Sequence, residues 1–568
     1  MLRLTDIKLP LDHAASALSE AVLARLGISA DELTGLTVAR RSYDARRRGA
    51  IVLIYSVDVE TPREAEILRR EAEAGGSEAG AGRSATKPKP PAPIKVVPTP
   101  DTRYRFVANA PDDLALRPIV IGTGPCGLFA GLVLAQMGFR PIILDRGKAV
   151  RERTVDTFGL WRKKVLNPES NVQFGEGGAG TFSDGKLWSQ ISDPKHYGRK
   201  VIAEFVEAGA PEEIAYVSKP HIGTFRLVSM VEHMRATIEA LGGEIRFSNR
   251  VDDLLVETDA AGVRHVRGVT LADGEQLRAD HVVLAIGHSA RDTFAMLHER
   301  GVLLEAKPFS IGFRIEHPQS LIDQARFGPQ AGHPLLGAAD YKLVHHCRNG
   351  RTVYSFCMCP GGTVVAAASE PGRVVTNGMS QYSRNERNAN AAIVVGITPE
   401  DFAPYGEGPL AGIALQRHWE SRAFELGGGQ YEAPAQLVGD FLQGRPSTRL
   451  GSVLPSYTPG VRLGDLAQAL PEYAIAAIRE ALPAFDRQLR GFAMDDALLT
   501  GVETRTSSPL RITRGDDGHS LNTRGLFPAG EGAGYAGGIL SAGVDGIRTA
   551  EAVALSVIAG VQGAAAPA

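Results

Sequence analysis

The sequence of 568 residues contains only four cysteines and no hydrophobic run long enough to cross a membrane. Four cysteines in so long a chain exclude a small secreted scaffold held by disulfides and fit a reducing compartment. A membrane helix needs about 18 apolar residues, whereas the longest obvious run, residues 51–57, has the length of a strand. The start, MLRLTDIKLPLD, reaches an aspartate before any apolar signal-peptide core. We therefore expect a cytoplasmic protein.

Net charge is nearly absent as well, since 62 Lys and Arg against 64 Asp and Glu give −2. No global field therefore attracts the chain to nucleic acid or to an anionic membrane, and neither is an expected partner. One local exception is an arginine cluster, with members Arg40, Arg41, Arg46, Arg47 and Arg48. Two interpretations of this cluster stay open, a basic patch for RNA or another anionic partner and a solvated hairpin.

Aromatic residues are missing from residues 61–100, where six prolines fall between Pro88 and Pro100. This composition predicts a linker that is flexible at GGSEAGAG and stiffer at KPKPPAP. Residues 1–60, before it, combine strand patterns with a helix over 14–26 that ends at Gly27. They predict a small N-terminal α/β domain.

The strongest motif begins at Pro118 with PIVIGTGPCGLFAGLVLAQMGFRPIILDRG, which indicates strand, glycine turn, helix and second strand. The first glycine allows a tight turn, the second lets a pyrophosphate approach the backbone, and the third lets the helix pack on the strand. The pyrophosphate would lie at the helix N-terminus, and the aspartate after the second strand can accept from ribose hydroxyls. The expected cofactor-binding residues of this motif are Gly122, Gly124, Pro125, Gly127, Asp145 and Arg146.

A second glycine motif near the C-terminus, RGLFPAGEGAGYAGGILSAGVDGIR (524–548), decides between FAD and NAD. A strand over 526–529 delivers Gly530 and Glu531 to the sheet edge where ligands bind. Glu531 can accept hydrogen bonds from ribityl hydroxyls, which a flavin has and NAD lacks. Gly537, Gly538 and Ile539 begin a helix whose positive end would stabilise charge on a reduced flavin. The two motifs together predict FAD.

Further stretches carry a family resemblance: NVQFGEGGAGTFSDGKL (171–187), HVVLAIGHSARD (281–292), CMCPGG (357–362), NGMS (377–380) and GVETRTSSPLRI (501–512). With the two glycine motifs, they resemble the FAD-dependent oxidoreductases of the glutathione reductase superfamily, in the branch with one dinucleotide domain and an inserted substrate domain. More narrowly, the sequence is similar to the bacterial "uncharacterized FAD-dependent dehydrogenase" family. The resemblance implies FAD and redox chemistry but no particular substrate. It also shows one departure, because Glu531 stands where the superfamily usually has an aspartate.

The expected fold class is α/β, an FAD-binding Rossmann-like three-layer domain with an inserted mixed-sheet substrate domain and a small N-terminal domain. The FAD-binding domain would comprise residues 101–310 and 500–568, and the substrate or cap domain residues 311–499. Gly178 and Gly180 belong to a loop permissive enough to fold over a cofactor. Val251 and Gly287 follow predicted strands of the FAD-binding domain. These four residues complete the expected cofactor site.

Three residues are candidates for catalysis: Lys186, Cys359 and Arg505. Lys186 would place a positive charge near flavin N5 or the substrate, or it is an ordinary solvent-facing lysine. Arg505, with Glu503, would line the same cavity as the possible anionic-substrate site at Arg384 and Arg387. Arg384 and Arg387 leave two interpretations, a site for an anionic substrate and a solvated polar loop.

The cysteine-rich stretch holds possible metal ligands at His345, His346, Cys347, Cys357 and Cys359. The sequence RNGR predicts a two-residue hairpin in which Arg348 pairs with Arg351. Cys347 would then lie about 17 Å from Cys357 and on the other sheet face, so no metal site is expected. Cys357 and Cys359 would share a face, either as a redox pair on a bent strand or as buried unreactive thiols.

The sequence shows no second strand–GxGxxG–helix unit, so NAD(P)H would act only as a transient reductant. We predict an FAD-dependent oxidoreductase, a dehydrogenase or reductase that uses hydride transfer at flavin N5. Its partner would be a small-molecule substrate, with an anionic one as an alternative, held between the FAD domain and residues 311–499. Two alternatives stay open, an NAD(P)H-dependent flavin monooxygenase and an FAD-containing binding or redox-sensing protein whose residues 1–60 dock a partner.

Overall fold

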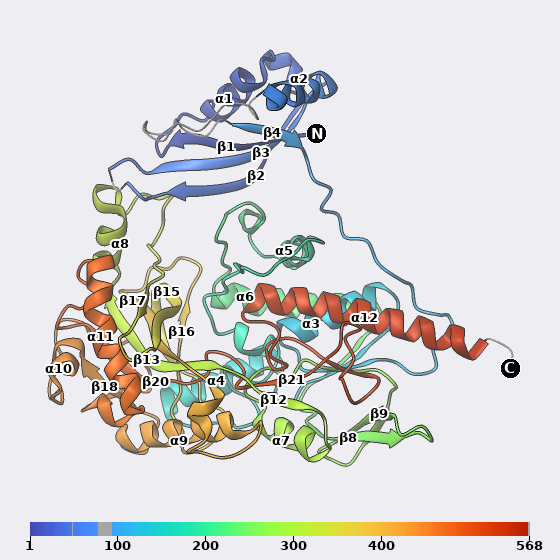
Figure 1. The fold of residues 1–568 in the computed structure, drawn as a ribbon, viewed down its shortest axis with the longest axis vertical. Coiled ribbons are helices and arrows are strands. Elements are labelled where there is room, and N and C mark those ends of the chain that lie inside the picture. Colours follow the sequence, from blue (N-terminus) through green and yellow to red (C-terminus); the bar gives the residue numbers. More distant parts are fainter. Residues whose placement is uncertain (48, 78–93, 566–568) are drawn as a thin grey trace.

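The computed structural model describes residues 1–47, 49–77 and 94–565, which form five β-sheets with helices packed around them (Figure 1). No helix within these residues is long and apolar enough to span a bilayer.

The N-terminal sheet has the strand order β2-β3-β1-β4 and lies at the top of Figure 1. Its elements are β1 (Leu2–Pro10), α1 (Ala17–Leu26), β2 (Gly35–Asp44), β3 (Val52–Glu60), α2 (Glu64–Ser77) and β4 (Lys95–Pro98). Gly27 ends α1 with φ 67°, in the left-handed region that glycine adopts without strain, as predicted. The helices cover one face of the sheet (Figure 1).

The segment predicted to be a linker, residues 61–100, contains both α2 and β4. Ala, Glu and Arg dominate the first part of α2 and favour a helix, and β4 pairs antiparallel with β1. Ile67 of α2 and Val96 of β4 are buried in the same core. The N-terminal sheet therefore continues beyond residue 60. The KPKPPAP stretch, residues 87–93, lies outside the described residues.

The N-terminal sheet contacts the rest of the chain directly. The edge strand β2 exchanges hydrogen bonds with residues 216–218, from Arg41 N to Tyr216 O (2.7 Å) and from Ser218 N to Arg41 O (2.9 Å). The Arg41 guanidinium lies 5.4 Å from the centre of the Tyr216 ring. Part of the predicted arginine cluster therefore serves an internal contact, which neither interpretation from the sequence included.

The parallel sheet has the order β22-β11-β5-β6-β7, with all neighbouring pairs parallel. Its strands are β5 (Ile119–Ile121), β6 (Ile142–Leu144), β7 (Glu244–Arg246), β11 (Val282–Leu284) and β22 (Leu526–Pro528). The neighbouring helices are α3 (Pro125–Gln136), α4 (Val150–Lys163), α5 (Tyr197–Glu207), α6 (Thr224–Ala240) and α12 (Ile539–Ala565). Helix α12 packs against α3, beside which it lies in Figure 1, and against α5.

The two faces of the parallel sheet belong to two separate cores. One face packs Val120 and Val283 against α3, α5, α6 and α12. The other packs Ile121 and Leu284 against a three-stranded antiparallel sheet and a helix. These elements are β8 (Val251–Thr258), β9 (Arg264–Leu271), β10 (Gln276–Arg278) and α7 (Arg291–Glu299). The predicted three-layer α/β architecture is confirmed, because consecutive strand residues alternate between the two cores.

The eight-stranded sheet, called the cap sheet below, has the order β14-β15-β17-β13-β20-β18-β19, with β16 on β15. Its strands are β13 (Phe309–Pro318), β14 (Val344–His346), β15 (Thr352–Ala366), β16 (Thr376–Ser380), β17 (Asn388–Ile397), β18 (Ala433–Leu437), β19 (Val461–Leu463) and β20 (Leu498–Glu503). Its helices are α8 (Gln319–Phe327), α9 (Ala411–Leu426), α10 (Val438–Gln443) and α11 (Glu472–Gln488). The sheet is mixed, as predicted, because β18 and β19 run parallel. A two-stranded sheet of β12 (Leu304–Ala306) and β21 (Leu510–Ile512) lies beside it.

The hairpin between β14 and β15 forms, but its predicted register is wrong by one residue. His346 pairs with Thr352, and Cys347 N donates to Arg351 O at 2.8 Å. Three residues therefore form the loop, and Gly350 takes φ 79°. A three-residue loop with glycine in the left-handed region is the next most common hairpin after the two-residue loop.

Candidate functional site

A cavity of about 260 Å³ lies at the carboxyl ends of the parallel strands, between them and the cap sheet. Most residues predicted to bind the cofactor line it, although they come from distant parts of the sequence. These are Gly122, Gly124, Pro125, Asp145, Arg146, Gly178, Gly180, Val251, Gly287, Glu531, Gly538 and Ile539. Gly127, Gly530 and Gly537, also predicted to bind the cofactor, do not line the cavity.

The glycine turn after β5 is built as its sequence requires. Gly122 has φ 104°, and a Cβ added there would lie 2.4 Å from the carbonyl oxygen of Ala285. A Cβ on Gly127 would lie 1.8 Å from the Gly122 oxygen, so this glycine permits close packing of α3 rather than contact with a ligand. Helix α3 begins at Pro125 with its free N–H groups at the cavity, an arrangement that favours a phosphate.

Asp145 lies at the end of β6 and is buried. Its carboxylate accepts hydrogen bonds from Thr123 N (2.9 Å), Thr123 Oγ1 (2.5 Å) and Gly147 N (2.8 Å). A carboxylate has about four acceptor sites, so one remains for a ribose hydroxyl. Asp145 therefore fastens the glycine turn to the next strand, a role that the motif did not predict.

Arg153 on α4 organises the glycine-rich loop and was missed by the sequence analysis. Its side chain is fully buried and donates to four backbone carbonyl groups of the loop. These are the oxygens of Asn171 (2.8 Å), Val172 (2.7 Å), Glu176 (2.6 Å) and Gly178 (2.9 Å). Because four acceptors converge on one guanidinium, the loop that carries Gly178 to the cavity has a fixed shape.

The C-terminal motif shapes the opposite side of the cavity. Burial raises the pKa of Glu531 to about 7, while Lys307 and a hydrogen bond from the Gly538 backbone act to lower it. Gly530 instead donates its N–H to Asp545 (2.7 Å), and a Cβ there would lie 2.8 Å from the Cβ of Cys126. Gly530 is therefore a packing residue, whereas Glu531 offers its carboxyl group to the cavity.

Lys186 lines the cavity at the cap side with a side chain that is 34% exposed. Its Nζ donates to the carbonyl of Met358 and lies 3.6 Å from Asp184 and 4.0 Å from Cys359 Sγ. Asp184 is also paired with Arg384. Lys186 is thus held against β15 by the protein, which differs from an ordinary solvent-facing lysine.

For the predicted catalytic residue Cys359, the structure differs in which thiol of β15 faces the cavity. Cys359 is buried and does not line the cavity, whereas Cys357 does. The cause is a bulge in β15, where the pairing with β17 shifts between Phe356 and Cys359. The alternating pattern used for the prediction assumes a regular strand, so it did not reveal which thiol faces the cavity.

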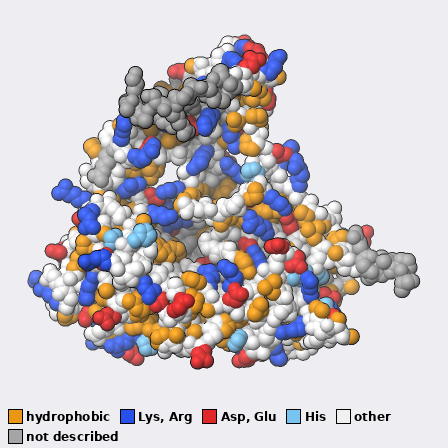
Figure 2. Space-filling view, in the orientation of Figure 1, with side chains coloured by type: hydrophobic (Ala, Val, Ile, Leu, Met, Phe, Trp, Pro, Cys, Tyr) orange, Lys and Arg blue, Asp and Glu red, His pale blue; other side chains and the backbone are white. Residues whose placement is uncertain are grey.

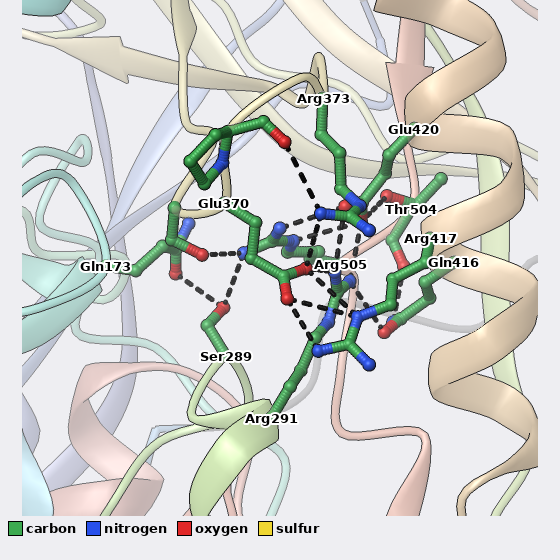
Figure 3. A network of polar contacts seen from close by, with 12 residues as sticks. Gln173, Ser289, Arg291, Glu370, Arg373, Gln416, Arg417, Glu420, Thr504 and Arg505 are labelled. Atoms are coloured by element: carbon green, nitrogen blue, oxygen red, sulfur yellow. Dashed lines mark hydrogen bonds and ion pairs between the residues drawn. The ribbon is translucent and has the colours of Figure 1, made fainter. Parts of the chain in front are cut away.

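Arg505 lines the cavity but is held by protein acceptors (Figure 3). It donates to Glu420 at 2.9 Å, to Ser369 at 2.6 Å and to Ser289 at 3.1 Å. Arg291 also binds Glu420, at 2.7 Å, and Glu420 is fully buried between the two guanidinium groups. These groups hold the pKa of the Glu420 carboxyl well below its usual value. Arg505 therefore belongs to a buried ionic network.

Arg384 and Arg387, the arginines considered for an anionic substrate, also bind acceptors of the protein. Arg384 pairs with Asp184 at 2.5 Å, and Arg387 donates to the carbonyl of Leu454 at 2.8 Å. Neither lines the cavity. Glu503 does line it and is paired with the fully buried Arg314 at 2.7 Å. The ion pair of Arg384 with Asp184 fits neither interpretation, whereas Arg387 is exposed in a loop of polar residues, which agrees with the solvated one.

One group of potential metal ligands lies among the described residues, away from the cavity. It joins His345 and Cys347 to Glu480 of α11, and it includes neither Cys357 nor Cys359. Glu480 already accepts hydrogen bonds from His345 and Arg348. Burial also raises the pKa of the Cys347 thiol, which opposes the thiolate form that a metal requires.

Comparison with known proteins identifies the cap sheet. The family model described as "FAD-dependent protein, C-terminal domain-like" matches residues 308–506, and a model of a domain of unknown function matches residues 1–60. An uncharacterized protein of Clostridium beijerinckii is 44% identical over 552 residues, which are 97% of this chain and 98% of that protein.

Two further similarities are more distant. A dual trans-enoyl reductase/FAD-dependent monooxygenase of Aspergillus terreus is 26% identical over 196 residues, 32% of this chain and 25% of that protein. The crystal structure of a geranylgeranyl bacteriochlorophyll reductase-like protein of Thermoplasma acidophilum is 12% identical, with a TM-score of 0.36. That match covers 78% of this chain and 79% of the other.

The cavity residues fit a bound flavin dinucleotide. A Cβ added to Gly287 or Gly538 would meet no atom within 4 Å, so both glycines face open space, and α3 presents its N-terminus to a phosphate. Fold and site together define a flavoprotein with one dinucleotide-binding sheet. The chain belongs to one family with the C. beijerinckii protein. Its residues 308–506 match the model of FAD-dependent proteins, and FAD is its cofactor.

Proposed function

We propose that this chain is an FAD-dependent oxidoreductase of the glutathione reductase superfamily that uses hydride transfer at flavin N5 on a small-molecule substrate. The supporting observation is the extent of the cavity. It joins the glycine turn after β5 to Phe356, Cys357 and Asn377 of the cap sheet. One end therefore suits the nucleotide, and the other offers side chains to a reacting molecule.

Bound FAD supplies the two-electron redox chemistry, and the protein supplies orientation and electrostatics. The N-terminus of α12 favours negative charge on the group that it faces. Lys186 holds an ammonium group at the cap side of the cavity. His288 stays neutral near pH 7, because burial and the nearby Arg505 and Arg291 lower its pKa to about 3. The protein thus offers Lys186 as a fixed cation and His288 as a neutral hydrogen-bonding group.

An anionic substrate group is proposed for Lys186, because its partner Asp184 is shared with Arg384. NAD(P)H is proposed as a transient reductant only. The face seen in Figure 2 mixes acidic and basic side chains, which supports the proposal that nucleic acid and membranes are not partners. A cytoplasmic location, expected from the four cysteines, stays a prediction.

The anaerobic absorbance spectrum of the purified protein tests this function. We expect a flavin absorbance band at ~450 nm. The band should bleach when a reducing substrate is added, and NADH and NADPH are the first two to be tried. Bleaching coupled to oxygen uptake and product hydroxylation would indicate a monooxygenase instead. A protein that contains no flavin and takes up no added FAD would contradict the proposal altogether.

Binding of FAD to the apoprotein should depend on pH through Glu531. The carboxyl group, with a pKa of about 7, is protonated below that pH, and its ionised form is the stronger acceptor for ribityl hydroxyls. We therefore expect FAD to bind about tenfold more tightly at pH 8 than at pH 6. Titrations of FAD fluorescence at both pH values measure this ratio.

Glu531→Gln should remove that dependence, because a glutamine does not titrate. Glu305→Gln is the matched control, since Glu305 is exposed on β12 and does not line the cavity. We expect the control to keep the ratio of the natural protein. A Glu531→Gln protein with an undiminished ratio would show that another group governs FAD binding.

A further inference from the structure

Two cysteines lie on the segment of β15 that faces the cavity, and the backbone there is irregular. β15 pairs with β17 at Phe356 opposite Ala392 and again at Cys359 opposite Asn390. Two residues, Cys357 and Met358, therefore oppose one residue of the partner strand, which is a β-bulge. Cys357 has φ 45°, in the left-handed region that non-glycine residues rarely adopt.

This bulge removes the obstacle that a regular strand sets to a disulfide between residues i and i+2. In an extended strand their Cα atoms lie near the upper limit for such a bond. Here three residues of β15 span the length of two on β17. The Sγ atom of Cys359 lies 3.4 Å from the backbone oxygen of Cys357. The Cys359 side chain is therefore folded back towards residue 357 across the bulge.

Two cations hold this bulge. Lys186 donates to the Met358 carbonyl, with its Nζ 4.0 Å from Cys359 Sγ. Arg314, fully buried, donates to the Cys357 carbonyl at 2.9 Å. The hydrogen bond from Cys359, with Lys186 and Arg314, holds the pKa of Cys357 well below its usual value. A low pKa and contact with a cavity are properties of reactive thiols.

The chain's other two cysteines show that this environment is specific. Cys126, behind the glycine turn, and Cys347, at the β14–β15 hairpin, are both buried. Burial raises the pKa of each thiol. Neither has a lysine or arginine among its hydrogen-bond partners, whereas Lys186 reaches Cys359. Cys347 therefore provides an internal control on the same strand pair.

We propose that Cys357 and Cys359 form a reversible disulfide that exchanges two electrons with FAD, an inference that rests on the proposed flavin function. One Cys357 thiolate, one Cys359 thiol and oxidised FAD give one disulfide and FADH⁻. The S–H bond of Cys359 breaks and an S–S bond forms. Two electrons and the Cys359 proton pass to the flavin. The reverse reaction reduces the disulfide.

Electron stoichiometry of the whole protein tests this proposal. The air-oxidised holoprotein is titrated anaerobically with dithionite and a redox mediator. We expect the natural protein to consume about four electrons per FAD, two for the flavin and two for the disulfide. Cys357→Ser and Cys359→Ser should each consume about two. Cys347→Ser should keep the value of the natural protein.

Alkylation of the natural protein gives a second readout that needs no variant. Protein taken before and after the titration is denatured in the presence of iodoacetamide, and its peptides are analysed by mass spectrometry. We expect alkylation at Cys126 and Cys347 alone before reduction, and at all four cysteines after it. An FAD-containing protein that consumes two electrons per FAD, with Cys357 and Cys359 alkylated throughout, overturns the disulfide but leaves the oxidoreductase proposal intact. A protein that binds no FAD contradicts the function itself.

Discussion

Gly127→Ala is expected to weaken FAD binding by up to about 100-fold, since the added methyl group has no room between helix and turn. Its Cβ would lie 1.8 Å from the Gly122 oxygen and 3.3 Å from the Cβ of Ala285. The closest contact is a backbone atom, so α3 must move away from β5. Such overpacking costs about 1–3 kcal/mol of stability, and the shift displaces the N–H groups that face the phosphate site.

Gly131→Ala on the same helix is the matched control. Its Cβ would meet the tip of the Ile143 side chain at 2.2 Å, and a side-chain end can turn away where a backbone carbonyl cannot. Alanine in a helix interior also favours the helix by about 1 kcal/mol over glycine. Equilibrium titration with FAD and thermal unfolding of both variants measure the contrast. If Gly127→Ala bound FAD as tightly as Gly131→Ala, the prediction would be wrong, and the glycine turn would not be part of the FAD site.

The glycine turn could be predicted because its residues are neighbours in the sequence. Gly122, Gly124 and Gly127 each act on the backbone within one turn of the chain, and the spacing alone specifies that geometry. The same holds for the C-terminal motif, where Glu531 and Gly538 reach one cavity from a single loop. The three-layer fold could be predicted as well, because the sequence shows continuous apolar strands, typical of buried strands, between predicted helices.

The contacts that fix the site join residues far apart in sequence, and no local pattern marks them. Arg153 reaches the loop 18 or more positions away, Arg291 reaches Glu420 over 129, and Arg314 reaches Glu503 over 189. Each arginine resembles a surface residue until its acceptors are known. The bulge at Cys357 is hidden for another reason, since a one-residue insertion leaves the composition of the strand unchanged.

Glu420→Gln is expected to lower the free energy of unfolding by about 3–5 kcal/mol, because it leaves buried guanidinium groups without their shared carboxylate. The side chains of Arg291 and Arg505 are 1% and 3% exposed. Arg291 keeps Glu370 as a partner, at 2.5 Å, whereas Arg505 keeps only neutral acceptors. Chemical denaturation at neutral pH measures the loss. The variant should also retain less FAD, because Arg505 lines the cavity.

The pH dependence of this loss has a definite sign. The pKa of Glu420 is lowered from 4.5 in the folded protein, so its stabilisation is complete above that value. As the pH falls below 4.5, the Glu420 carboxylate binds a proton in the unfolded chain but stays ionised in the folded protein. The stabilisation of the folded protein therefore declines. The difference between natural protein and Glu420→Gln should therefore be constant near neutrality and shrink in acid. Glu425→Gln, on the same helix with a 65% exposed side chain, should change stability by less than about 0.5 kcal/mol.

The combined variant Glu420→Gln/Arg505→Gln separates charge pairing from packing. If the ion pair is the cause, removing both charges should cost less than the sum of the single losses, since the second substitution removes a buried charge that the first left unpaired. Additive losses would mean that the two side chains stabilise the cap sheet independently. In that case Arg505 would be an uncoupled cation of the cavity, and it would be a candidate for binding an anionic substrate in place of Lys186.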